Sequence, residues 1–79
     1  LGRIDDALDC GERTRRELLA AGDEAAAGRV EINLGSMLLR QHRYPEAAAL
    51  YRCAAARLAR RGDRRHSVMA DIGLATALG

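Results

Sequence analysis

Four stretches of the chain carry apolar residues at the three- and four-residue spacing of an amphipathic helix. Two Gly-Asp steps, Gly22-Asp23 and Gly62-Asp63, and the segment 41–45 separate these stretches. Glycine readily takes the left-handed conformation that ends a helix, aspartate is a good N-cap, and proline is favoured in the first helical turn. The pattern therefore predicts an all-α fold with four helices over residues 4–21, 24–41, 45–61 and 64–78.

The apolar positions differ between the predicted helices. The first and the third carry one stripe each, formed by Ile4, Ala7, Leu8, Gly11, Thr14 and Leu18, and by Ala47, Leu50, Tyr51, Ala54 and Leu58. The second has Val30, Leu34, Met37 and Leu38 on one side, but Ile32 and Leu39 on another. A helix that is apolar on more than one face is packed between neighbours, so we expect the second helix to be the inner one.

The sequence also contains an internal repeat with an offset of forty residues. Gly22-Asp23 recurs as Gly62-Asp63, and apolar residues on both sides of this step recur with it. The matching pairs are Ala7 with Ala47, Leu18 with Leu58, Ile32 with Ile72, Leu34 with Leu74, and Leu38 with Leu78. We infer two copies of a forty-residue unit that are cut out of phase.

Residues 28–61 resemble the tetratricopeptide repeat, in its longer variant of about forty residues. The resemblance rests on six residues of the second and third predicted helices: Leu34, Gly35, Leu38, Ala47, Tyr51 and Ala54. It implies antiparallel helix-turn-helix repeats stacked as an α-solenoid. The whole chain, 1–79, would then be one segment: the second helix of a partial repeat (1–22), a complete repeat (23–61), and the first helix of another (62–79).

Three positions depart from the family pattern. Glu31 stands where the family often has Trp, and Ala59 where it often has Pro. Gly11 stands at the position that Tyr51 occupies one repeat later. A glycine inside a helix costs about 1 kcal/mol relative to alanine. It also leaves space, so we expect the first helix to pack less well or to admit another chain.

Composition narrows the class of protein. Sixteen Ala, eleven Leu and thirteen Arg without Lys favour helix, and exclude a β-sandwich, a collagen-like fibre and a disulfide scaffold. No charge-free run approaches the ~20 residues of a membrane span, so we expect no membrane partner. Arginine without lysine, beside abundant Ala and Gly, suggests a GC-rich bacterial genome. The start at Leu1 suggests a fragment of a larger bacterial protein.

Candidate chemistry is sparse. No nucleophile motif or phosphate-binding loop is present, and His42 and His66 are isolated. Cys10 and Cys53 lie far apart. We expect both thiols to be free and buried, which places the protein in the reducing cytoplasm. The sequence therefore predicts no enzyme activity, no metal and no cofactor.

An arginine cluster lies around the end of the third predicted helix. Its members are Arg57, Arg60, Arg61, Arg64 and Arg65. Nucleic-acid binding would need interleaved aromatic residues for base stacking, which are missing here. Arginine at a helix C-terminus complements the helix dipole. We therefore assign the cluster a structural role and expect no nucleic-acid partner.

A polar stripe on the second predicted helix is the most informative feature for function. Arg29, Asn33, Ser36 and Arg40 follow spacings of four, three and four residues, which put them on one helix face. The resemblance implies that this face lines a concave groove for an extended peptide or a partner helix. Asn33 would bond the main chain of the ligand, and both arginines would attract its carboxylates. A plain solvated face would carry the same pattern.

The forty-residue equivalents on the fourth helix would extend this groove. Met69 is an adaptable apolar residue, Gly73 would leave an open floor, and Thr76 follows one turn later. We expect Ile32, Leu39 and Met69 to act as apolar anchors for the ligand.

Three hypotheses for function remain. The first is a protein–protein interaction or scaffolding module that binds a protein or peptide partner in this groove. The second is self-association, as a dimer, by a helix swap or by end-to-end stacking, because a repeat array cut at both ends exposes faces that neighbours normally cover. The third is a regulatory arm of an enzyme or transcription regulator whose active domain lies outside this segment.

Overall fold

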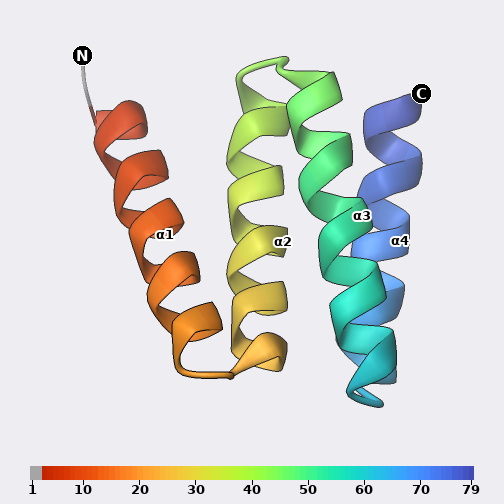
Figure 1. Cartoon of the computed structure of the whole chain (residues 1–79). Coiled ribbons are helices and arrows are strands. Elements are labelled where there is room, and N and C mark those ends of the chain that lie inside the picture. Colours follow the sequence, from red (N-terminus) through yellow and green to blue (C-terminus); the bar gives the residue numbers. More distant parts are fainter. Residues whose placement is uncertain (1–2) are drawn as a thin grey trace.

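Short turns at residues 21–23, 41–43 and 61–63 divide the chain into helices (Figure 1). The computed structural model describes residues 3–79, and these residues form helices and no strand. The helices are α1 (Arg3–Ala20), α2 (Glu24–Arg40), α3 (Tyr44–Arg60) and α4 (Arg64–Leu78). Each bound lies within one residue of its predicted position, which confirms the all-α, four-helix prediction.

The turns follow from local chemistry. Gly22 and Gly62 have φ angles of 79° and 75°, in the left-handed region that glycine takes without steric cost. Asp23 Oδ1 then accepts the Ala26 N–H at 3.1 Å, and Asp63 Oδ1 accepts the His66 N–H at 3.2 Å. Each aspartate satisfies one of the N–H groups that a helix start leaves unpaired.

The helices pack as antiparallel neighbours along the chain (Figure 1). Among the described residues, α1 packs against α2 alone, whereas α2 contacts all three other helices. Residues on several sides of α2 are buried, among them Ala27, Ile32, Leu34 and Leu38. The expectation that the second helix is the inner one is therefore confirmed.

The ring of Tyr51 occupies the centre of the α2, α3 and α4 packing. It lies against Gly35 of α2, where an added Cβ would come within 2.8 Å of the ring Cζ, and also against Gly73 of α4. The prediction that Gly73 leaves an open floor is wrong, because Tyr51 fills this space. Glycine at both positions lets the two helices approach the ring closely.

Gly11 has the same role between α1 and α2. A Cβ at this position would lie 2.5 Å from Leu34 Cδ2, so the side chain of Leu34 fills the space that we expected to be vacant. The helix nevertheless packs less well than the others, as predicted, because no residue of α1 is buried.

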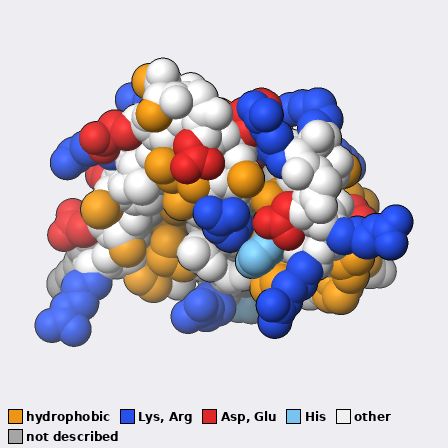
Figure 2. Space-filling model, turned by 90° about the horizontal axis from the view of Figure 1, so that it is seen from below, with side chains coloured by type: hydrophobic (Ala, Val, Ile, Leu, Met, Phe, Trp, Pro, Cys, Tyr) orange, Lys and Arg blue, Asp and Glu red, His pale blue; other side chains and the backbone are white. Residues whose placement is uncertain are grey.

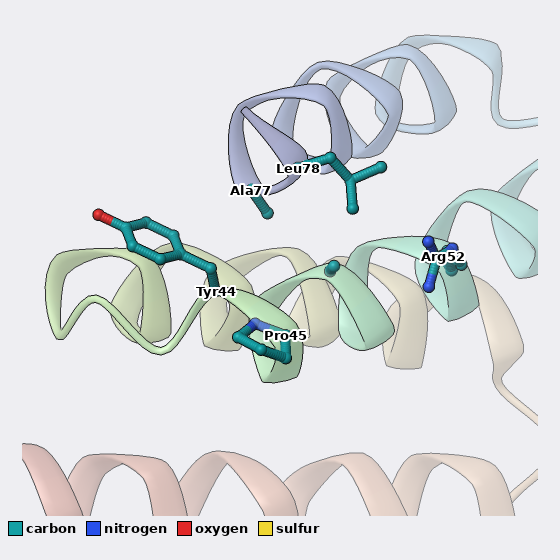
Figure 3. A pocket seen from close by; sticks show the side chains of 6 residues that line it. Tyr44, Pro45, Arg52, Ala77 and Leu78 are labelled. Atoms are coloured by element: carbon teal, nitrogen blue, oxygen red, sulfur yellow. The ribbon is translucent and has the colours of Figure 1, made fainter.

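The end of α4 leaves a hollow of about 350 Å³ over the start of α3 (Figure 3). Tyr44, Pro45 and Arg52 line it from α3, and Leu78 lines it from α4. The side chain of Leu78 is 62% exposed, whereas Leu38, forty residues earlier, is 5% exposed. The two copies of the repeat therefore form equivalent helices, but their equivalent apolar residues differ in burial.

The turn at His42 provides a test of this local account. His42 has a φ of 58°, which costs a residue with a Cβ about 1 kcal/mol. We expect His42→Gly to raise the free energy of unfolding by about 0.5–1 kcal/mol, even though the exposed bond between His42 Nδ1 and the Tyr44 hydroxyl is lost.

Chemical denaturation followed by circular dichroism measures this change. The matched control is Gln41→Gly, at a φ of −91°, which we expect to destabilise the fold by about 0.5–1 kcal/mol. Equal effects of the two glycine substitutions would contradict the strain assigned to His42.

Candidate functional site

The carboxylate of Glu31 is fully buried between three helices. Its Oε2 accepts a hydrogen bond from Arg15 Nε of α1 at 2.6 Å, and its Oε1 accepts one from Arg57 Nε of α3 at 3.0 Å. A buried charge is tolerated only where it is paired and hydrogen-bonded, and here each carboxylate oxygen has its own arginine. The hydrogen bond to Glu31 raises the pKa of Arg15 against the opposing effect of burial.

Glu24 extends this network toward the start of α2. It lies within ion-pair distance of three arginines: Arg57 and Arg60, both at 3.4 Å, and Arg61 at 3.1 Å. Partial burial opposes ionisation of this carboxyl, but the arginines, Arg60 first, outweigh it and lower its pKa. Figure 2 looks onto this end of the molecule and shows basic and acidic side chains interleaved.

The arginine cluster is therefore largely part of this network. Arg57, Arg60 and Arg61 pair with Glu24, while Arg64 and Arg65 are exposed at the start of α4. The helix dipole alone accounts for these arginines in the sequence, whereas the structure adds an acidic partner. This partner, Glu24, is at the start of the preceding helix, 33 residues before Arg57 and 36 before Arg60, so local sequence does not reveal it.

The polar stripe of α2 is partly engaged inside the molecule. Arg29 Nη1 lies 3.8 Å from Asp63 Oδ2 at the start of α4, and Ser36 Oγ lies 3.0 Å from the Tyr51 hydroxyl. Ser36 is half-buried, whereas Arg29, Asn33 and Arg40 are exposed. The three exposed residues remain candidates for contact with a ligand, and Ser36 orients Tyr51 instead.

The α4 candidates lie on a neighbouring helix, because α4 packs against α2 as well as α3. The side chain of Met69 is 48% exposed. Thr76 is exposed, but its hydroxyl donates to the Ile72 carbonyl at 3.0 Å, within its own helix. Thr76 also lines a second hollow, of about 370 Å³, with Tyr44, Leu78 and the last residue. Of the two α4 candidates, Met69 is therefore the one whose side chain is available to a ligand.

Several expectations about burial are wrong. Ile32 belongs to the buried core and Leu39 packs against that core, so neither is an available anchor. Cys10 and Cys53 are free thiols, as expected, but both are exposed. Periodicity placed each cysteine beside the apolar stripe of its helix. The packed face of α1 and of α3 does not extend as far as these neighbouring positions, so both thiols reach the solvent.

The histidines take part in turns. His42 is exposed and bonds Tyr44, and His66 Nδ1 lies 2.9 Å from Asp63 Oδ2 in the first turn of α4. The hydrogen bond from His66 is the main cause that lowers the pKa of Asp63. Within residues 3–79, no three His, Cys, Asp or Glu side chains converge as metal ligands do.

The buried network around Glu31 was not predicted from the sequence, in which Glu31 stands where the family often has Trp. One signal was present: Glu31 shares a helix face with Ala27, Leu34 and Leu38, all apolar. A lone acidic residue on an apolar face requires a basic partner from another helix. The sequence contains many arginines, so it could not identify Arg15 and Arg57 as the partners.

Comparison with protein-family models, with curated proteins and with solved structures returned no match for this chain. Among the described residues, none of the helices combines the length and apolar character needed to cross a bilayer. Fold and side-chain geometry are therefore the basis for a functional proposal.

Removal of the buried charge tests the role of Glu31. We expect Glu31→Gln to lower the free energy of unfolding by about 2–3 kcal/mol, because Arg15 and Arg57 lose their shared partner but still reach water. Denaturation of Glu31→Gln and wild type gives this difference. The matched control is Asp71→Asn, at the exposed position forty residues later, where we expect a change below about 0.5 kcal/mol. Similar losses in both variants would refute the assignment.

The pH dependence of stability tests the Glu24 network. Glu24 and Asp63 have pKa values below those of an unfolded chain. Their ionised forms therefore stabilise the fold above about pH 4.5, and this contribution is lost as the pH falls through the lower pKa of the folded state. We expect the melting temperature to fall on acidification in that range, and Glu24→Gln to flatten the profile. Thermal melts between about pH 3 and pH 7 measure it, with the exposed Asp9→Asn as control. An unchanged slope in Glu24→Gln would contradict the network.

Proposed function

We propose that this chain is a protein-recognition module of tetratricopeptide-like type, in which α2 and α4 present one binding face to an extended peptide or a partner helix. We name this surface the α2–α4 face and define it by Arg29, Asn33, Arg40 and Met69. The observation that carries the proposal is that these four side chains are exposed on two helices in direct contact. The step is one of binding and involves no catalysis.

The contacts that hold α2 and α4 together behind this face support this role. Tyr51 packs against glycines of both helices and shares a hydrogen bond with Ser36, while Arg29 lies near Asp63 across the same helix pair. A preorganised surface loses less conformational entropy when it binds.

The chemistry of the face favours an acidic ligand. Arg29 and Arg40 can pair with carboxylates, the Asn33 amide can both donate to and accept from a peptide main chain, and Met69 adapts to an apolar side chain. Exposed free thiols at Cys10 and Cys53 fit a reducing compartment, and we include a cytoplasmic location in the proposal.

A displayed library of random decapeptides tests the proposal. We expect selection on the wild-type chain to enrich peptides rich in Asp and Glu. Binding of these peptides should weaken about tenfold in Asn33→Ala and in Arg40→Ala, as is usual for a central contact. Titration calorimetry measures the affinities, and Arg13→Ala, an exposed arginine of α1, is the control. Enrichment that is absent, or binding that Asn33→Ala leaves intact, would overturn the proposal.

A further inference from the structure

The outer face of α4 carries apolar side chains that no helix covers among the described residues. Val68 and Ile72 are 52% and 62% exposed, and Ala75 is exposed beside them. Forty residues earlier, Gly28, Ile32 and Gly35 of α2 are all buried. There Leu58 and Tyr51 of α3 lie against the two glycines. The face of α4 is therefore equivalent to the face of α2 that α3 covers.

Helix α1 has the complementary free face. It contacts α2 through Gly11 and Arg15, and their equivalents on α3, Tyr51 and Ala55, contact α4. Thus α1 is docked on α2 as α3 is docked on α4. Ala47 and Ala54, on the side of α3 that holds α2, are fully buried. Their equivalents on α1 are Ala7 and Thr14, and both are exposed.

We propose that α4 of one copy of this chain packs against α1 of a second copy, in the arrangement that α2 and α3 have within one copy. The occupant of the α4 face is thus a second copy, and the contact continues the established α2–α3 interface from one molecule to the next. Because each copy uses one face at either end, the contact is head to tail and leaves a free face for a further copy. This association is independent of the peptide-binding role proposed above.

Side-chain volume is distributed differently in this arrangement. Within one copy, the large Tyr51 packs against the small Gly35. Between copies, the larger residue is on the other helix, since Ala75 replaces Gly35 and Gly11 of the second copy replaces Tyr51. Ile72 repeats the core residue Ile32 unchanged. The pair Ala75 and Gly11 is smaller than Gly35 and Tyr51, while Val68 in place of Gly28 adds volume opposite Leu18, the equivalent of Leu58. The two helices therefore repack their side chains and do not repeat the α2–α3 contact atom for atom.

Charge is complementary at one pair of positions. Within one copy, Glu24 of α2 pairs with Arg57 of α3. Forty residues away, these positions hold Arg64 and Glu17, so the pair recurs between copies with its signs exchanged. One contact is unfavourable, because Asp71 stands where Glu31 does and would face Glu17 of the second copy instead of an arginine.

Light scattering coupled to size exclusion, from about 1 µM to about 1 mM, tests the proposal on the 79-residue chain. We expect the mass of the wild type to rise with concentration beyond that of a dimer. Ile72→Glu, a change at an exposed position, should stay monomeric with unchanged helicity by circular dichroism. The control is Met69→Glu, whose equivalent Arg29 is exposed on α2, and it should associate as the wild type does.

A mixing experiment tests the head-to-tail geometry. Thr14→Arg blocks the α1 face and Ile72→Glu blocks the α4 face, so each variant alone should be monomeric. The equimolar mixture should form 1:1 dimers and nothing larger, because only one pair of intact faces remains. A symmetric dimer through α4 would leave Thr14→Arg associated, and that result would overturn the proposal.

A variant that should associate more tightly than the wild type provides a third test. Asp71→Arg replaces the one like-charge contact by an opposite-charge pair and should tighten association a few-fold, an effect that added salt reduces. If both the wild type and Asp71→Arg remain folded monomers at every concentration, the proposal is wrong and the α4 face serves another partner. Asn33→Ala should leave association unchanged, and this separates failure here from failure of the peptide-binding proposal.

Discussion

The buried carboxylate of Glu31 is the constraint on which the arrangement of the helices depends. It is held by one arginine from α1 and one from α3, so three of the four helices meet at a single charge. Removal of an ion from water is costly, and the attraction within the pair offsets this cost only where geometry is good and every hydrogen-bonding site is used. Each Glu31 oxygen accepts one hydrogen bond from an arginine, at 2.6 and 3.0 Å. The contact therefore specifies which helices are neighbours more than it adds net stability.

Helix α1 shows why this specificity matters. None of its residues is buried, and it packs against α2 alone among the described helices. Its contacts with α2 include the packing of the Leu34 side chain against Gly11 and the hydrogen bond from Arg15 to Glu31. An amphipathic helix obtains most of its stability from tertiary packing, and a short apolar contact supplies little of it. The ion pair fixes the position of α1 where the apolar area cannot.

Local features of this structure could be read from the sequence, and non-local ones could not. Periodicity, Asp23 and Asp63 as caps, and the Gly-Asp turns act within a few residues, so the helix bounds were predicted to within one residue. The burial of Glu31, the exposure of Cys10 and Cys53, and the position of Tyr51 at Gly73 depend on which helix lies opposite. Of the candidate binding residues, Ser36 was assigned to a ligand because periodicity shows its helix face but not the Tyr51 hydroxyl beside it. The tetratricopeptide resemblance stays a proposal.

The two equivalent interfaces, α1 on α2 and α3 on α4, reach the same packing by different chemistry. In the second, Tyr51 fills the space between helices and Ala55 is small. In the first, Gly11 and Arg15 stand at these positions, so an arginine reaches the acid on α2 where a tyrosine would otherwise fill the gap. Asp71, the equivalent of that acid, is exposed, and Ala55 offers it no cation. The α1–α2 interface thus depends on an ion pair, and the α3–α4 interface depends on apolar contact.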